Sequence, residues 1–185
     1  MTPTQLIAAT GCNTANAERF AGPLAQAMET AQITTPLRMA HWLSQWAHET
    51  AAFAYMTEIY DGSSYENRKS LGNTQPGDGR KFRGRGLPML TGRDNYREFG
   101  AWLKLKCAMD VDLLEHPEIV ATNPAIACLA AAWYWSSRGI NRFADKDDCL
   151  AVSIAINGKG KDGLPNHFEE RKTLLARAKR AFLIA

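Results

Sequence analysis

The chain lacks any apolar run approaching the length of a membrane span, and it carries little net charge. A transmembrane helix needs about 20 consecutive apolar residues, and no such run is present. The formal net charge of +3 is too small to indicate nucleic acid as a partner, although a mild positive field suits an anionic polymer. With 45% hydrophobic and 22% charged residues over 185 positions, the composition is that of one soluble globular domain.

The N-terminal stretch MTPTQLIAAT also lacks a basic residue in front of its short apolar segment, and the first arginine is Arg19. A secretory signal carries positive charge before its apolar core. We therefore expect a protein that is made in the cytoplasm without a signal peptide.

Motifs for metal binding and nucleophilic catalysis are missing as well. Four cysteines occur without a C-x-x-C pair, which argues against a zinc site and a dense disulfide framework, and we expect scattered buried thiols. The run HETAA lacks the second histidine of a zincin metallopeptidase, and RGRGLPML lacks the third glycine of a dinucleotide fingerprint. There is no G-x-S-x-G motif. We expect neither a metal nor a cofactor.

What the sequence does contain is helical pattern at both ends and a glycine-rich middle. Seven glycines between positions 62 and 92 predict loops and short hairpins there. Few alternating β-branched runs occur, so we expect a mainly α fold with a small β element in the middle. The expected helices cover 16–32 with a break at Gly22 and Pro23, 35–52, 94–105, 124–137, 150–156 and 167–182.

The expected helix over 35–52 contains the stretch WLSQWAHET, in which a carboxylate follows two tryptophans. His41, Gln45 and Glu49 recur at i, i+4 and i+8 beside an apolar stripe, a pattern typical of a core helix that lines a cleft. Burying an unpaired carboxylate is costly. Either Glu49 has a partner elsewhere in the chain, or desolvation near Trp46 and Phe53 keeps it protonated, as a general acid requires.

A second carboxylate, Glu58, follows in YMTEIYDGSSY among polar and tyrosyl groups that favour the ionised form. Two carboxylates in opposed environments are the working groups of a glycosidase. The spacing of nine residues is common by chance, so a surface Glu58 and a structurally satisfied Glu49 remain the alternative on these residues alone.

Four blocks of sequence add a resemblance to a known family. They read AHWLSQWAHETAAF, GNTQPGDGRKFRGRGLPMLTGRDNYREFG, AAAWYWSSRGINRFAD and SIAINGKGKDG, in this order. Over about 17–177 the chain resembles the family 19 glycoside hydrolases, most of all the lysozyme-like endolysins of bacteriophages and prophages. The resemblance implies one catalytic domain, 1–185, with a two-lobed lysozyme/chitinase-like α+β fold. A larger helical lobe (about 1–60 and 125–185) and a smaller loop-rich lobe (about 61–124) would enclose a cleft for an N-acetylated glycan.

The resemblance also implies roles for individual residues. Glu49 matches the general acid, Glu58 the probable base, with Asp61 and Glu66 as runners-up, and Thr91 a hydroxyl that holds the attacking water. Arg171 matches an arginine near the acid. The residues expected to contact or support substrate are His48, Tyr60, Arg85, Asn95, Tyr96, Asn157 and Arg171.

Two positions depart from the family pattern. Met89 stands where relatives usually carry an amide side chain, and Lys159 replaces a glycine. One hydrogen bond to substrate or water is therefore expected to be missing or supplied elsewhere.

Six basic residues between positions 80 and 97 face a single acid, Asp94. They form either a solvated face or a basic cleft wall suited to the carboxylates of peptidoglycan, which chitin does not have. We therefore expect a monomeric endolysin that cleaves β-1,4 bonds in peptidoglycan strands by acid and base catalysis with inversion. It would act in the periplasm after a holin-type partner permeabilises the membrane, and which glycosidic bond is cut stays open. A chitinase and a non-catalytic wall-binding module are the alternatives.

Overall fold

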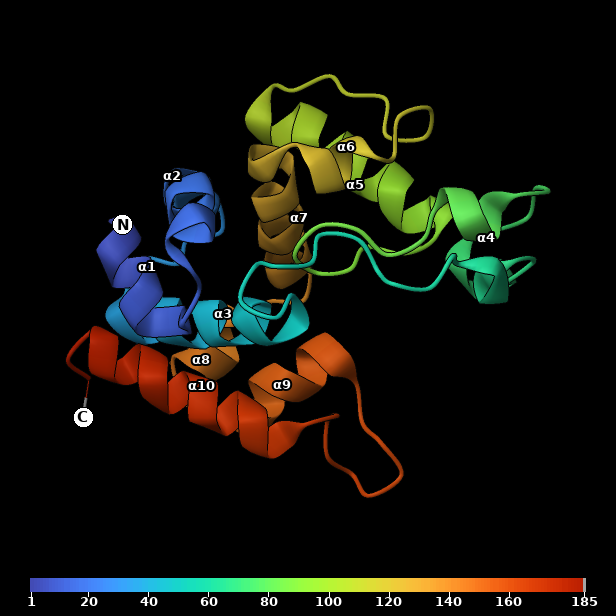
Figure 1. The fold of residues 1–185 in the computed structure, drawn as a ribbon. Helices are drawn as coiled ribbons and strands as arrows, with labels where there is room; N and C mark the ends of the chain where they lie inside the picture. The colour runs from blue at the N-terminus through green and yellow to red at the C-terminus, as the bar shows by residue number, and fades with distance from the viewer. Residues whose placement is uncertain (185) are drawn as a thin grey trace.

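The computed structural model describes residues 1–184 and consists of helices joined by loops (Figure 1). The mainly α expectation is confirmed. The helices are α1 (Pro3–Thr10), α2 (Thr14–Thr30), α3 (Pro36–Glu49), α4 (Asp78–Lys81), α5 (Arg93–Cys107), α6 (Ile119–Thr122), α7 (Pro124–Ser137), α8 (Asn141–Ala144), α9 (Cys149–Asn157) and α10 (Phe168–Ala181). Two 3-10 turns, η1 (Ser63–Tyr65) and η2 (Lys69–Leu71), precede α4.

Capping residues explain where several helices begin. Thr35 accepts a hydrogen bond from the backbone N–H of Arg38, and Pro36 occupies the first helical position of α3. Helix α1, which was not among the expected helices, begins with a capping box in which Thr2 and Gln5 satisfy each other's backbone N–H groups. The sequence carries this signal, because Thr2 and Gln5 stand three residues apart at the start of an apolar run.

The break expected at Gly22 and Pro23 is wrong, because α2 continues through both residues. A proline inside a helix removes one backbone hydrogen bond. Helix α2 nevertheless buries Phe20, Ala21 and Leu24, and it packs along α7. This burial of apolar surface outweighs the local cost.

The small β element expected in the middle is reduced to two isolated antiparallel bridges within residues 1–184. Thr57 pairs with Arg85, and Arg85 pairs with Leu90. Gly86 and Pro88 lie between the last two partners, and a proline has no N–H to extend a ladder. The middle segment is therefore loops and short turns, as its glycine content predicted.

Two groups of helices share the core. Helix α7 is buried over most of its length and packs against α2, α5 and α6, whereas α3 packs against α1, α8, α9 and α10. Trp46 of α3 joins the groups, since its ring meets Trp135 and Tyr134 of α7 edge-on at centroid distances of 6.4 and 6.1 Å. The core thus fixes α3, which carries the candidate acid, from both sides.

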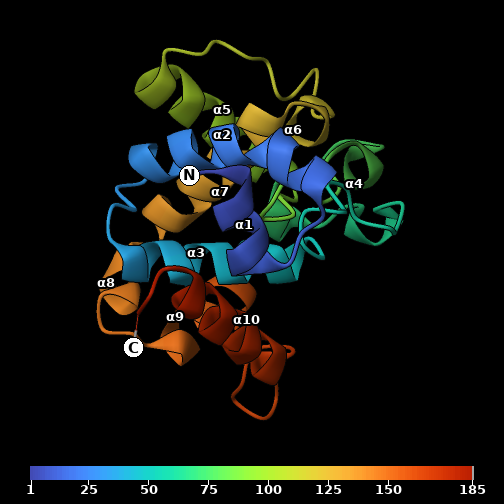
Figure 2. The same ribbon diagram turned by 60° about the vertical axis from the view of Figure 1, so that its left-hand side comes forward.

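The glycine-rich segment lies at one end of the molecule. In both views α4 and its adjoining loops lie on the right, away from α1 and α10 (Figures 1 and 2). The division into a larger and a smaller lobe stays a prediction.

The cysteines correct one expectation. All four are free, but only Cys12 and Cys128 are buried, whereas Cys107 and Cys149 are partly exposed at the ends of their helices. Within residues 1–184, no cluster of three His, Cys, Asp or Glu side chains is placed to hold a metal ion.

Candidate active site

Glu49 is the last residue of α3, which ends three residues earlier than the sequence pattern predicted. The next residues, Ala51, Ala52 and Phe53, have φ values of 48°, 54° and 66°. A left-handed conformation costs about 1–2 kcal/mol for each L-residue. The Thr50 hydroxyl holds this turn, because it donates to the Trp46 carbonyl at 2.6 Å and accepts from the Phe53 N–H at 2.9 Å.

The carboxylate of Glu49 has a charged partner. Nη2 of Arg171, on α10, donates to Glu49 Oε1 at 2.6 Å. The Arg171 side chain is 1% exposed and that of Glu49 is 19% exposed. Two explanations were possible for a carboxylate in this helix. The structure supports the first, because Glu49 has a partner from a distant part of the chain. The side chain of Glu49 still reaches the surface.

The polar stripe of α3 does not line an open cleft, which corrects the sequence interpretation. His41 and Gln45 are both 0% exposed. Nε2 of His41 lies 2.8 Å from a carboxylate oxygen of Asp147, and Gln45 accepts a hydrogen bond from Arg171 at 2.6 Å. The stripe faces the segments around α9 and α10 because their polar groups satisfy it, and only its end at Glu49 is open to solvent.

Glu58 is held by the glycine-rich segment. Its backbone N–H donates to the Gly84 carbonyl at 3.0 Å, and the Tyr65 hydroxyl donates to its Oε2 at 3.0 Å. Burial and this bond to the carboxylate raise the pKa of Tyr65, which therefore stays a donor at neutral pH. The other oxygen, Oε1, is buried and has no hydrogen-bond partner among residues 1–184.

Gly84 brings Glu58 and Thr91 together. A Cβ atom built at position 84 would lie 2.9 Å from Glu58 Oε2 and 3.3 Å from Thr91 Oγ1. The Thr91 hydroxyl donates to the Met89 carbonyl at 2.8 Å, so its oxygen can still accept a hydrogen bond. A carboxylate and a hydroxyl oxygen thus share one small space, as the positioning of a water molecule would require.

The two runners-up for the base have structural partners. Glu66 accepts from the backbone N–H groups of Gly77 and Gly79 at 2.7 and 2.8 Å. Asp61 accepts from the Ser63 N–H at 2.9 Å and pairs with Arg80 at 2.9 Å. The hydrogen bonds from Ser63 hold the pKa of Asp61 below its ordinary value. The contacts therefore favour Glu58 over both.

Four of the expected substrate residues have some exposure to solvent. Tyr60 is 82% exposed. Asn95 donates to the Thr91 carbonyl at 2.7 Å, and the exposed Asn157 accepts from the Asn166 N–H at 2.8 Å. Nδ1 of His48 lies 3.3 Å from Glu170 without the alignment of a hydrogen bond. Burial lowers the pKa of His48, so its ring is neutral at neutral pH.

Arg85 and Tyr96 do not lie where a sugar could reach them, which corrects two predicted contacts. Tyr96 is 0% exposed and its hydroxyl donates to the Arg83 carbonyl at 2.8 Å, while burial raises its pKa to about 12. Arg85 is 9% exposed and donates to the Tyr96 hydroxyl at 3.0 Å and to the Lys81 carbonyl at 2.8 Å. The two side chains hold the glycine-rich loop together.

The basic middle segment is largely neutralised. Its ion pairs join Arg80 to Asp61, Lys81 to Glu115, Arg93 to Asp78 and Arg97 to Asp94. Arg85 is buried. Arg83 is half-buried, with its Nε buried and unbonded, and it has no acidic partner among residues 1–184. The expectation of a strongly basic cleft wall is therefore weakened.

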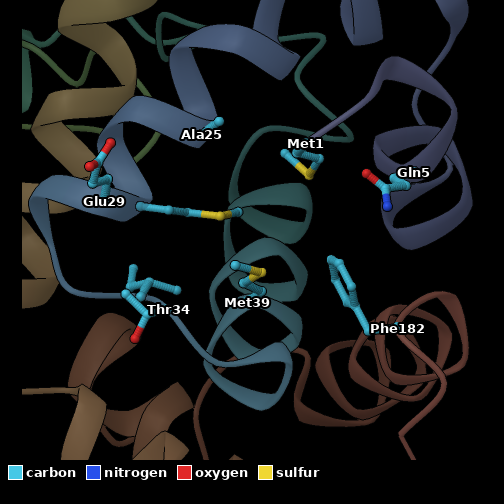
Figure 3. Close-up of a pocket in the computed structure, with 9 residues that line it drawn as sticks. Met1, Gln5, Ala25, Glu29, Thr34, Met39 and Phe182 are labelled. Atoms are coloured by element: carbon cyan, nitrogen blue, oxygen red, sulfur yellow. The ribbon is translucent and has the colours of Figure 1, made fainter.

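A mostly apolar hollow lies elsewhere in the molecule. It has a volume of about 480 Å³ and lies between α1, α2, α3 and the C-terminal segment (Figure 3). Its lining is mostly apolar and comprises Met1, Gln5, Ala25, Met28, Glu29, Ile33, Thr34, Met39 and Phe182. None of these is a predicted site residue, whereas Glu49 has the buried Arg171 as a partner and Glu58 has the Tyr65 hydroxyl.

Sequence reasoning placed Glu58 among the tyrosyl groups of YMTEIYDGSSY without singling out Tyr65, and it missed Gly84. Tyr65 follows Glu58 by seven residues, and the two side chains meet because the loop between them and the 3-10 turn η1 fold back, not because they share a helix face. Gly84 is one glycine among several, and its role depends on which side chains fold against it. A signal for Gly84 would have been the absence of a side chain between two arginines in RGRG.

The packing around Gly84 predicts that Gly84→Ala damages activity more than stability. The added methyl group would meet the ends of the Glu58 and Thr91 side chains, which can move, and a misplacement of about 1 Å can cost up to about 100-fold in rate. We expect such a loss of kcat with nearly unchanged thermal unfolding. Gly22→Ala is the matched control, because nothing lies within 4 Å of its added Cβ. Equal activity of the two variants would contradict the placement of Glu58.

Comparisons with known proteins agree with these observations. The model of the glycoside hydrolase 19 family, described as chitinase class I, matches residues 6–159. A glycosyl hydrolase family 19 domain-containing protein of Haemophilus influenzae is 34% identical over 118 residues, which cover 64% of this chain and 53% of that protein. The endochitinase EP3 of Arabidopsis thaliana is 35% identical over 101 residues, covering 54% of this chain and 34% of that protein.

The chain spans about half or less of the length of these curated relatives. Among solved structures, chitinase C of Streptomyces griseus HUT6037 superposes with a TM-score of 0.79 at 20% identity, covering 99% of this chain and 76% of that one. A class IV chitinase of Zea mays gives a TM-score of 0.68 at 21% identity, covering 88% and 79%. Both likenesses concern the fold. Because the family model covers most of the chain, the protein belongs to glycoside hydrolase family 19.

Proposed function

We propose that the chain hydrolyses β-1,4 bonds between N-acetylated sugars, with Glu49 as the general acid and Glu58 as the general base. The observation that carries this proposal is that the two carboxylates have different hydrogen-bonding neighbours. Glu49 is bound by the buried guanidinium of Arg171, whereas Glu58 lies beside the hydroxyl groups of Tyr65 and Thr91. Two carboxylates with separate roles are what glycoside hydrolysis requires.

Arg171 gives the acid its advantage in the transition state. As Glu49 transfers its proton to the glycosidic oxygen, negative charge develops on a carboxylate that the guanidinium already faces at 2.6 Å. A preorganised positive group that stabilises developing charge lowers the barrier. On the other side of the bond, Glu58 would take a proton from water while the Thr91 oxygen accepts the second hydrogen of that water.

This arrangement predicts hydrolysis with inversion. An inverting enzyme needs room for water between its carboxyl groups, about 6.5–9.5 Å apart, whereas a retaining nucleophile stands at about 5–5.5 Å. The left-handed turn separates Glu58 from the end of α3, and Thr91 is placed to share the water. We expect the α-anomer in the earliest products, observed by proton NMR. A β-anomer at the first time points, or a trapped sugar adduct on Glu58, would contradict this role.

We further propose bacterial peptidoglycan as the substrate. The net charge of +3 suits its carboxylates, and the sequence blocks resemble phage endolysins more than plant chitinases. Chitin is the second candidate, because several similar proteins are named endochitinases. Purified sacculi and chitin oligomers, assayed side by side, separate the two. Mass spectrometry of released muropeptides then identifies which glycosidic bond is cut.

The proposed setting is host lysis by a monomer that reaches the cell wall after a holin-type partner permeabilises the inner membrane. No helix among residues 1–184 is both long and apolar enough to cross a bilayer. Expression of the chain alone, with and without a membrane-permeabilising agent, tests the need for a partner. Lysis without the agent would count against this setting.

A further inference from the structure

Gln45 is fully buried in the middle of α3, and both the oxygen and the nitrogen of its side-chain amide form hydrogen bonds. Its Oε1 accepts from Nη1 of Arg171 at 2.6 Å, and its Nε2 donates to the Ser153 hydroxyl at 3.1 Å. Ser153 in turn donates to the Cys149 carbonyl at 2.7 Å. Because a guanidinium can only donate, the amide oxygen of Gln45 must face Arg171, and the amide nitrogen then faces Ser153.

The same guanidinium binds Glu49 one helical turn further along α3. Arg171 uses Nη1 for Gln45, Nη2 for Glu49 and Nε for the Asn166 carbonyl at 3.0 Å. A planar guanidinium held by three acceptors has little freedom to rotate. Gln45 therefore restrains Arg171, and Arg171 in turn restrains the carboxylate of Glu49.

We propose that Gln45 is a positioning residue for the general acid, and that its neutrality matters as much as its hydrogen bonds. A neutral acceptor orients Arg171 and leaves the whole positive charge to Glu49. A carboxylate at position 45 would share that charge, because two acids would then face one guanidinium inside the protein. This inference rests on the proposed glycosidase function of Glu49.

Two substitutions separate orientation from charge. Gln45→Met keeps a similar volume but releases Nη1 of Arg171, so kcat should fall about tenfold to 100-fold. The KM should stay unchanged, because the buried Gln45 does not reach substrate. Gln45→Glu keeps an acceptor for Arg171 and should retain more of kcat. Its activity should persist to higher pH than that of the unmodified chain, because Glu49 gives up its proton less readily.

Ser44→Ala is the matched control. Ser44 is also fully buried on α3, but its hydroxyl donates to the His41 carbonyl of its own helix and has no link to Arg171. This variant should keep kcat and the pH profile. If Gln45→Met does not fold, as judged by circular dichroism, Ser153→Ala removes the acceptor of the amide instead and should lower kcat by a smaller factor.

A second measurement does not depend on turnover. The carboxyl carbon of Glu49 can be followed by ¹³C NMR against pH and assigned by its loss in Glu49→Gln. In Gln45→Glu its titration should move to higher pH. The role of Gln45 would be overturned if the Glu49 titration in Gln45→Glu and the kcat of Gln45→Met were both unchanged. A rise in the KM of Gln45→Met with unchanged kcat would also overturn it. If the unmodified chain cleaves neither sacculi nor chitin, yet Gln45→Glu shows the shifted Glu49 titration, the proposed function is overturned and the positioning role of Gln45 is kept.

Discussion

The Glu49→Gln variant should lose about 100-fold or more of the glycosidase activity while it keeps its fold. General acid catalysis contributes about 10²–10⁴-fold, and an amide of the same shape has no proton to give to the leaving oxygen. The amide oxygen can still accept from Arg171, so the contact at the end of α3 is retained. Initial rates on the preferred substrate and thermal unfolding by circular dichroism measure the two effects.

Glu170→Gln is the matched control for this experiment. Glu170 is a neighbouring carboxylate near His48, but its side chain is 59% exposed, and the acceptors of Arg171 within residues 1–184 are Asn166, Gln45 and Glu49 instead. It should keep nearly full activity. Normal activity of Glu49→Gln would show that another group is the acid. If the unmodified chain binds sacculi without releasing fragments, the alternative of a non-catalytic wall-binding module is the correct one.

Arg171→Met should lower both stability and activity. The side chain is 1% exposed, and its removal leaves Gln45 and Glu49 without their shared donor. Breaking a buried ion pair by removing one partner costs about 3–5 kcal/mol, and the 19% exposure of Glu49 places this case toward the lower end. Chemical unfolding measures the loss of stability, and kcat should fall because the acid loses its orientation.

A double variant tests whether the loss comes from the ion pair. Glu49→Gln combined with Arg171→Met removes the uncompensated carboxylate, so it should be more stable than Arg171→Met alone. Arg177→Met is the control on the same helix, since Arg177 is exposed and binds only backbone carbonyls of α1. It should cost less than about 1 kcal/mol. Strict additivity of the two single changes at positions 49 and 171 would contradict the coupling.

Local pattern was sufficient where the determining interactions lie within a few residues. Thr35 with Pro36 and Asn123 with Pro124 mark the starts of α3 and α7, because caps and the first helical turn are short-range features. The glycine-rich middle was predicted as loops for the same reason. Pattern failed at Pro23, where contacts between α2 and α7 override a local break, and after Glu49, where the backbone turns left-handed at 51–53.

The sequence by itself determined a mainly helical chain, the resemblance to family 19 glycoside hydrolases, and Glu49 as a carboxylate in an aromatic helix. The resemblance implied an arginine near this acid, but only the tertiary structure shows the bond from Arg171, 122 residues away, to Glu49 and Gln45 together. It also decided that Arg85 and Tyr96 are buried, and that Gly84 leaves space for Glu58 beside Thr91. The physical reason is that helix period and capping are local, whereas the partner of a buried charge depends on how distant helices pack.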